Sequence, residues 1–195
     1  GLSGPQFAAR QRRRRQRPPA PADDEVLCRT LQLGVCGTDR EILAAKNPLV
    51  PAGESFLVLG NECLARVEAV GSQVTSVSPG QLVVPTVRRP IGEPEHRIDL
   101  LSFGQYSERG IVEHHGFSQP YWTETPEFLI AIDEELAPVA VLAEPQAVAE
   151  KAANEALLLQ QARLGESAWT ENKPRVLVTG QGPIAFAAVI ACVAR

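Results

Sequence analysis

The 195-residue sequence contains no methionine and is poor in aromatic residues, histidine and cysteine. Its four cysteines (Cys28, Cys36, Cys63 and Cys192) are irregularly spaced with no C-x-x-C pair, which argues against a disulfide framework and a structural zinc ribbon. We therefore expect a reducing, cytoplasmic setting. The longest nearly unbroken apolar run, residues 184–194, is shorter than the ~20 residues that a membrane-spanning helix needs, so no membrane partner is expected.

Acidic residues are missing from the first 22 positions, which carry six arginines. The net charge of the whole chain is −4, so the remaining residues together carry −10 once those six positive charges are set aside. The arginine-rich stretch has no apolar segment and no interleaved aromatic residues, and we interpret residues 1–17 as a disordered tail. Contact with nucleic acid is the alternative use of such a tail.

The segment after the proline-rich linker at 18–21 is predicted to form β-structure in short pieces. Turn residues recur between the pieces, which is the pattern of a small barrel. A short helical turn is expected over 40–46, and the polar residues 88–105 are interpreted as a surface lobe. Strands are predicted over 25–33, 63–71, 82–85 and 128–132.

Apolar residues between 136 and 161 recur mainly at three- and four-residue steps, which predicts helix. Pro145 is interpreted as marking a helix start, so Glu144 lies at a helix N-terminus. The dipole there favours a carboxylate or a group bound to it, and an ordinary acidic residue in the first turn is the alternative. The adjacent His114 and His115 are interpreted as structural or surface residues, because neighbours on a strand point to opposite faces.

The most compact candidate site is Gly34-Val35-Cys36-Gly37-Thr38-Asp39. It brings a thiol, a hydroxyl and a carboxylate together on a turn whose glycines let the backbone approach a ligand. Such a group suits a metal ion with a proton path beside it. An ordinary turn, with Cys36 as a small buried side chain, is the alternative.

A second informative stretch stands near the C-terminus. Residues 175–179 read as a strand, and they run into Gly180-Gln181-Gly182-Pro183-Ile184-Ala185 and then a helical run over 186–195. Strand, glycine turn and helix is the order of a dinucleotide-binding unit, in which a pyrophosphate rests on the helix N-terminus. We predict that Gly180, Gly182, Pro183 and Ile184 begin a cofactor site for NAD or NADP.

These motifs together resemble the medium-chain zinc-dependent alcohol and polyol dehydrogenases. The resemblance covers about residues 18–195 and extends to the glucose 1-dehydrogenase branch through Pro85–Pro90 and Glu108–Val112. Its other elements are Gly34–Asp39, Leu59-Gly60-Asn61-Glu62, Val70-Gly71, Pro79-Gly80, Glu144-Pro145 and Gly180–Ile184.

The resemblance implies a mainly β GroES-like barrel catalytic domain with helices over residues 18–165. It further implies the first strand, turn and helix of a truncated α/β Rossmann domain over 174–195. The implied reaction is oxidation of a sugar or polyol hydroxyl, such as glucose C1 to a lactone, with hydride transfer to NAD or NADP. Members of the family are homo-oligomers at full length, and their substrates are small molecules.

The resemblance also implies roles for individual residues. Cys36 and Glu144 correspond to zinc ligands, Glu62 stands beside the metal, and Thr38 relays the substrate proton. Asn61 stands where the family has a histidine ligand, so Zn²⁺ would be weakly held. Glu108 and Glu150 are candidates for binding sugar hydroxyls.

The chain also departs from the family in its extent, because it includes only one strand and most of one helix of the dinucleotide-binding unit. We therefore expect an inactive fragment with an incomplete NAD(P) site. The alternative is a non-catalytic truncated barrel or an interaction module that contacts nucleic acid through its basic tail, although we do not expect nucleic acid to be the partner.

Overall fold

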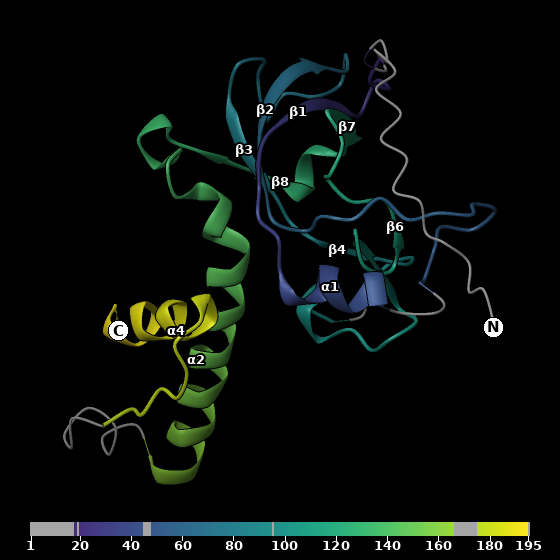
Figure 1. Ribbon diagram of the computed structural model, residues 1–195. Coiled ribbons are helices and arrows are strands. Elements are labelled where there is room, and N and C mark those ends of the chain that lie inside the picture. The colour runs from purple at the N-terminus through teal and green to yellow at the C-terminus, as the bar shows by residue number, and fades with distance from the viewer. Residues whose placement is uncertain (1–17, 19, 45–47, 95, 166–174, 195) are drawn as a thin grey trace, which may run out of the picture.

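A computed structural model describes residues 18, 20–44, 48–94, 96–165 and 175–194 of the chain. Two β-sheets form one body, and two long helices stand beside it (Figure 1). The predicted tail at 1–17 and most of the predicted loop at 164–173 lie outside the described residues.

The larger sheet has five strands, and each of its neighbouring pairs is antiparallel. Its inner face carries most of the core, where the Trp122 ring lies 4.6 Å from that of Phe117. The four strands predicted from apolar patterning all belong to this sheet, and β7 was missed. The spatial order is β7 (Tyr121–Glu124), β1 (Val26–Leu33), β2 (Cys63–Val70), β3 (Leu82–Pro85) and β8 (Leu129–Ile132).

The smaller sheet corrects the prediction that residues 88–105 are only a surface lobe. Its strands are β4 (Arg88–Pro90), β5 (Tyr106–Arg109) and β6 (Glu113–His114), with β4 antiparallel and β6 parallel to β5. Arg89 on β4 is buried, because its guanidinium has an ion-pair partner inside the protein. Short 3₁₀ helices connect the elements at Ile98–Leu100, Pro126–Phe128, Glu134–Leu136 and Ala140–Leu142.

Three α-helices complete the described structure. Helix α1 (Gly37–Ala44) begins earlier than the predicted turn at 40–46 and includes Asp39 in its first turn. Helix α2 (Ala143–Leu164) begins at the predicted Glu144-Pro145 step. Helix α4 (Pro183–Val193) packs on α2 through small side chains, and it lies on the side of α2 away from the sheets in Figure 1.

The predicted strand at 175–179 does not form, although the glycine turn and helix after it do. A strand exists through its hydrogen bonds to a neighbour, and no strand of the described structure lies beside these residues. Within the described part of the chain, no helix is long and apolar enough to cross a membrane.

Candidate active site

The thiol loop joins β1 to α1 and is held by a buried carboxylate. Asp39 Oδ2 accepts a hydrogen bond from the backbone N–H of Cys36 at 2.9 Å. Asp39 Oδ1 accepts a second one from the N–H of Gly60 at 3.3 Å. Because Asp39 is buried in the first turn of α1, this one side chain fixes the loop before α1 relative to the loop before β2.

Glycines bring the loop before β2 close to its neighbours. Gly60 has φ +96°, a left-handed conformation that favours glycine. A Cβ on Gly116 would overlap the carbonyl oxygen of Gly60, and a Cβ on Gly110 would lie 2.7 Å from the same oxygen. Three chain segments therefore meet at Gly60, and the next residue, Asn61, has a fixed backbone and a buried side chain.

Side chains from both loops meet the N-terminus of α2. The Cys36 thiol donates a hydrogen bond to Asn61 Oδ1 at 3.3 Å. Burial and the negative charge of Glu62 raise the pKa of Glu144 to about 7, and a hydrogen bond from Asn61 acts in the opposite direction. Cys36, Asn61, Glu62 and Glu144, which were singled out from the sequence, are thus close together in the structure.

Two further predicted residues lie beside this group. Burial and the charge of Asp39 raise the pKa of Glu62. Its carboxylate lies so close to Gly34 that a Cβ there would overlap Oε2, so the approach depends on that glycine. Thr38 is half-buried in the first turn of α1, two residues after Cys36.

A cavity of about 680 Å³ lies between the sheets and α2. Its walls are mostly apolar, and Glu108 from β5 faces it together with Glu144. Glu108 Oε1 accepts hydrogen bonds from Arg88 Nε and Nη2 at 3.0 and 2.9 Å, across directly paired strands. Glu150 lies outside the cavity lining, and its Oε1 accepts a hydrogen bond from Gln146 at 2.9 Å. An apolar cavity with a few convergent polar groups is suited to a small-molecule ligand.

The metal that the sequence resemblance implies can be tested against these side chains. Zinc prefers thiolate, imidazole and carboxylate ligands, and an amide oxygen is not among them. Among the described residues, no three or more His, Cys, Asp or Glu side chains are grouped so that they could hold a metal ion. As they lie, Cys36, Asn61, Glu62 and Glu144 do not fit a catalytic zinc.

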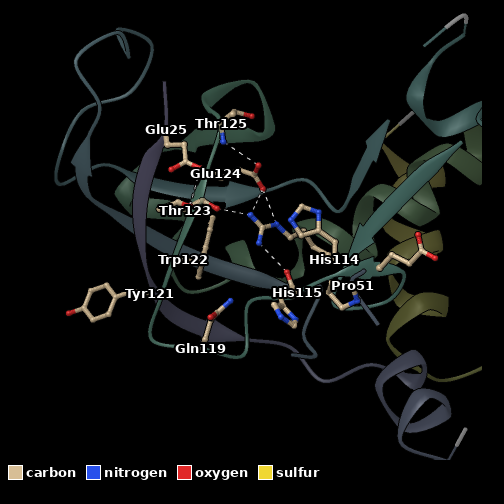
Figure 2. Close-up of a pocket in the computed structure, with 12 residues that line it drawn as sticks. Glu25, Pro51, His114, His115, Gln119, Tyr121, Trp122, Thr123, Glu124 and Thr125 are labelled. Carbon is tan, nitrogen blue, oxygen red and sulfur yellow. Dashed lines mark hydrogen bonds and ion pairs between the residues drawn. The ribbon is translucent and has the colours of Figure 1, made fainter. Parts of the chain in front are cut away.

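A second cavity, of about 440 Å³, lies on another side of the β-structure and is lined by both adjacent histidines (Figure 2). Burial and the positive charge of Arg109 lower the pKa of His114 to about 4. His115 stacks on Phe56, and its Nε2 lies 3.1 Å from a carboxylate oxygen of Glu54. These contacts agree with the interpretation of both histidines as structural.

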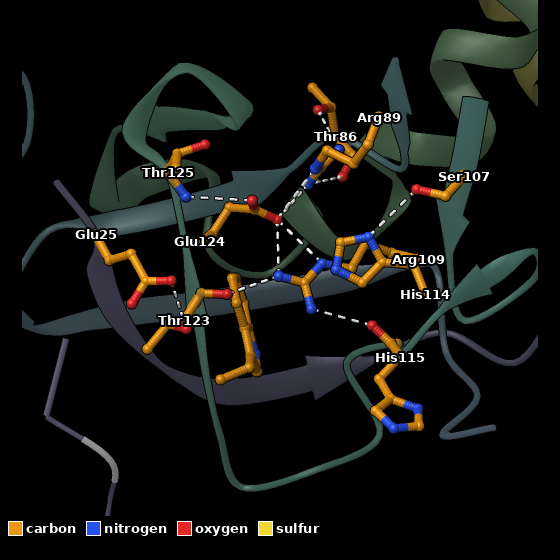
Figure 3. Close-up of polar contacts among 12 residues, drawn as sticks. Glu25, Thr86, Arg89, Ser107, Arg109, His114, His115, Thr123, Glu124 and Thr125 are labelled. Atoms are coloured by element: carbon orange, nitrogen blue, oxygen red, sulfur yellow. Dashed lines mark hydrogen bonds and ion pairs between the residues drawn. The ribbon is translucent and has the colours of Figure 1, made fainter. Parts of the chain in front are cut away.

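A buried ion cluster connects the two sheets beside this second cavity (Figure 3). Arg89 from β4 and Arg109 from β5 both donate to Glu124 Oε2 on β7, and the backbone N–H of Thr125 donates to Oε1. Burial alone would raise the pKa of Glu124, but the two arginines outweigh it and hold that pKa below the ordinary value. Glu108 on β5 is therefore adjacent to Arg109, the residue that anchors this strand.

Sequence reasoning missed Asp39 and this ion cluster as parts of the architecture. Asp39 offered a signal, because a carboxylate three residues after Cys36 at a helix start can accept a backbone hydrogen bond. Glu124 offered none, since its arginine partners are 35 and 15 positions away in the sequence.

The C-terminal glycine turn leads directly into α4. Gly180 has φ +123°, and Gly182 precedes the first turn of α4 with Pro183 at its start. The carbonyl of Gly182 accepts hydrogen bonds from the N–H groups of Ala185 and Phe186 at 3.0 and 3.3 Å. Gly180, Gly182, Pro183 and Ile184 thus form a glycine turn leading into a helix.

Comparison with known families gives a match over residues 22–122, more than half of the chain, to the alcohol dehydrogenase GroES-like domain. The chain belongs to this family. The matched residues include both site loops and strands β1 to β6.

Individual proteins with known names are similar to this chain in sequence. It is 38% identical to glucose 1-dehydrogenase 1 of Vulcanisaeta moutnovskia, over 88% of this chain and 48% of the relative. It is 40% identical to glucose 1-dehydrogenase 1 of Caldivirga maquilingensis, over 85% of this chain and 46% of the relative. The chain therefore spans about half the length of the curated relatives it matches.

Solved structures show the same fold. Glucose dehydrogenase of Haloferax mediterranei, in complex with NADP, Zn and gluconolactone, aligns with a TM-score of 0.67 at 35% identity, over 76% of this chain and 43% of that one. The 2R,3R-butanediol dehydrogenase of Bacillus subtilis aligns with a TM-score of 0.67 at 20% identity, over 93% of this chain and 51% of that one. The predicted mainly β GroES-like fold class is confirmed.

Proposed function

We propose that the chain is the catalytic-domain half of an oxidoreductase that oxidises a sugar or polyol hydroxyl, such as glucose C1 to the lactone, with hydride transfer to NAD or NADP. The supporting observation is the cavity of about 680 Å³, where Glu108 and Glu144 lie next to the Cys36 and Asn61 loops. The 35% identity to a glucose dehydrogenase that binds gluconolactone favours a sugar over other alcohols.

Roles for the cavity residues follow from this proposal. Glu108 accepts hydrogen bonds from substrate hydroxyls, since Arg88 occupies only one of its carboxylate oxygens among the described residues. Glu150 is the weaker substrate candidate, because it lies outside the cavity lining. Thr38 would relay the hydroxyl proton from beside Cys36. Zinc would be held only weakly by Cys36, Glu62 and Glu144, and Asn61 is the reason for the weakness.

The division of the chain is part of the proposal. Residues 1–17 are an arginine-rich tail, 18–165 the catalytic domain and 174–195 the start of the NAD(P)-binding domain. Gly180, Gly182, Pro183 and Ile184 are proposed to begin the NAD(P) cofactor site. A cytoplasmic location and homo-oligomerisation of the full-length enzyme are likewise proposed.

Binding of sugar by the chain itself tests the substrate proposal. Isotope-labelled chain would be titrated with glucose and with gluconolactone, and amide chemical shifts followed by NMR. Shifts are expected at Glu108, Ile111 and Val148 around the cavity. Glu108→Gln should reduce them, whereas Glu150→Gln, outside the lining, should retain them. If neither ligand perturbs the cavity in the unsubstituted chain, the proposed substrate is wrong.

A further inference from the structure

The Asn61 amide holds the Cys36 thiol inside the site. Its side chain is buried, with the residue only 4% exposed. Oδ1 accepts the hydrogen bond of the Cys36 thiol at 3.3 Å. A thiol that donates this hydrogen bond carries its proton, whereas a zinc ligand is the thiolate.

Three separate elements come together around this amide. Cys36 belongs to the loop after β1, Asn61 to the loop before β2 and Glu144 to the first turn of α2. Glu144 is close enough to Asn61 for the amide to lower its pKa against the effect of burial, and it also lines the 680 Å³ cavity. Asn61 thus lies among the side chains that a shared metal ion would otherwise have to hold together.

The fold gives Asn61 little freedom to leave this position. The preceding residue, Gly60, donates its N–H to Asp39 and is enclosed by Gly110 and Gly116. The Gly60 carbonyl accepts a hydrogen bond from the Phe117 N–H at 2.9 Å. Because the preceding residue is held by these contacts, the Asn61 side chain stays buried against the Cys36 thiol.

We propose that the Asn61 amide takes the place of a metal ion in this chain, holding the Cys36 thiol by a hydrogen bond beside Glu144 and leaving the site unable to hold zinc at micromolar concentrations. Zinc would have to displace the thiol proton and break the hydrogen bond that the buried amide accepts. In return it would gain a neutral amide oxygen, a poor ligand for zinc. The inference rests on the proposed function, because it concerns the same cleft.

Thiol reactivity measures zinc binding without any need for enzyme activity. Cys28 and Cys63 are buried, so Cys192→Ser leaves Cys36 as the accessible thiol. Alkylation of Cys36 would be timed with and without micromolar zinc, and bound zinc counted by elemental analysis after dialysis. In the Cys192→Ser background we expect the same alkylation rate with and without zinc, and substoichiometric metal.

Asn61→His in the same background supplies the missing imidazole. We expect zinc to slow its alkylation at least tenfold, with an affinity gain of at least about 100-fold, larger than the effect of losing an outer-sphere partner. Asn154→His places an imidazole on α2 instead of at position 61, and it should change neither the alkylation rate in zinc nor the zinc affinity. Zinc bound stoichiometrically by the chain with Asn61 intact would overturn the inference, and so would a folded Asn61→His variant that gains no zinc.

Asn61→Ala keeps the inference testable if the histidine variant fails to fold. Removing the amide without adding a ligand should speed Cys36 alkylation and lower the melting temperature, with no protection by zinc. An alanine variant with unchanged alkylation and melting would show that the amide does not hold the Cys36 thiol. Sugar titrations of the same proteins distinguish the two proposals. If the zinc proposal fails, glucose or gluconolactone should still shift the amide resonances around the cavity.

Discussion

At Asp39, one carboxylate determines how the two site loops stand relative to each other. Its two oxygens accept N–H bonds from Cys36 and Gly60, which belong to loops separated by α1 and the residues that follow it. Its charge also raises the pKa of the neighbouring Glu62. Asp39 is therefore both a structural acceptor and a source of the negative potential in the cleft.

Asp39→Asn tests both of these roles. An amide can accept only through its oxygen, so one of the two N–H groups is left facing a donor, and we expect a loss of about 1–3 kcal/mol in the free energy of unfolding. With the negative charge removed, the pKa of Glu62 should fall. Urea unfolding and a carboxyl NMR titration measure the two effects. Glu41→Gln, an exposed change in the same helix, is the control and should alter neither.

The site residues that stand in short sequence motifs could be predicted, and those held by contacts between distant segments could not. Cys36, Asn61, Glu62 and Glu144 stand in short motifs, and their proximity in space follows from the fold that those motifs indicate. The hydrogen bond from the Cys36 thiol to Asn61 could not be foreseen, because it depends on how the loop after β1 stands relative to the loop before β2. Arg89 lies in the segment that was interpreted as a surface lobe. Only the pairing of Arg89 and Arg109 with Glu124 explains their burial.

At the scale of elements, patterning predicted the strands whose side chains meet the main core. β1, β2, β3 and β8 contain apolar runs and were placed to within a few residues. β4, β6 and β7 have two to four residues each, too few to show a period. The pairing of β7 is with β1, far away in the sequence. Residues 175–179 were predicted to form a strand and do not, because strand propensity alone does not form a strand without a neighbouring strand.

Glu124 holds β4 and β5 against β7, and we expect Glu124→Gln to be strongly destabilising. Loss of the negative charge leaves two buried guanidinium groups unbalanced, which costs about 3–5 kcal/mol at neutral pH. Urea unfolding at pH 7 measures this effect. Glu127→Gln, exposed at the adjacent 3₁₀ helix, should change stability little.

Acid should act on the same ion cluster. The pKa of folded Glu124 lies below its ordinary value of 4.5, so the stability it contributes is complete above that pH. It is lost as the pH falls through the folded-state pKa. Stability of the unsubstituted protein should therefore decline more steeply below pH 4.5 than that of Glu124→Gln. Parallel profiles for the two proteins would contradict the assignment of this acid sensitivity to Glu124.

The contact between α2 and α4 depends on small side chains. Ala149 on α2 packs against Ala187 and Ala191 on α4, and all three are buried. Ala149→Leu should force the helices apart and cost about 1–3 kcal/mol, because extra methylenes overpack a close contact. Faster amide hydrogen exchange in α4 would report the separation. Ala152→Leu, on an exposed position of α2, provides the matched control and should leave exchange unchanged.

At the scale of the whole molecule, the β-structure and the helical end differ in how completely they bury apolar side chains. The sheets enclose Val26, Val83 and Phe117 at 0% exposure. Helix α4 has no charged residue, and it leaves Phe186 65% and Val193 81% exposed. Contiguous apolar surface of this kind is unusual on a monomer in water and favours association.

We therefore predict that the chain self-associates through α4 as its concentration rises. Phe186→Glu should keep the protein monomeric over the same concentration range, because it places a charge in the centre of the exposed apolar face. Sedimentation velocity measures the size distribution directly. Leu43→Glu, at a similarly exposed position on α1, adds the same charge away from α4 and should associate as the unsubstituted chain does. Equal suppression by both substitutions would assign the effect to net charge, and association that persists in Phe186→Glu would place the contact surface elsewhere.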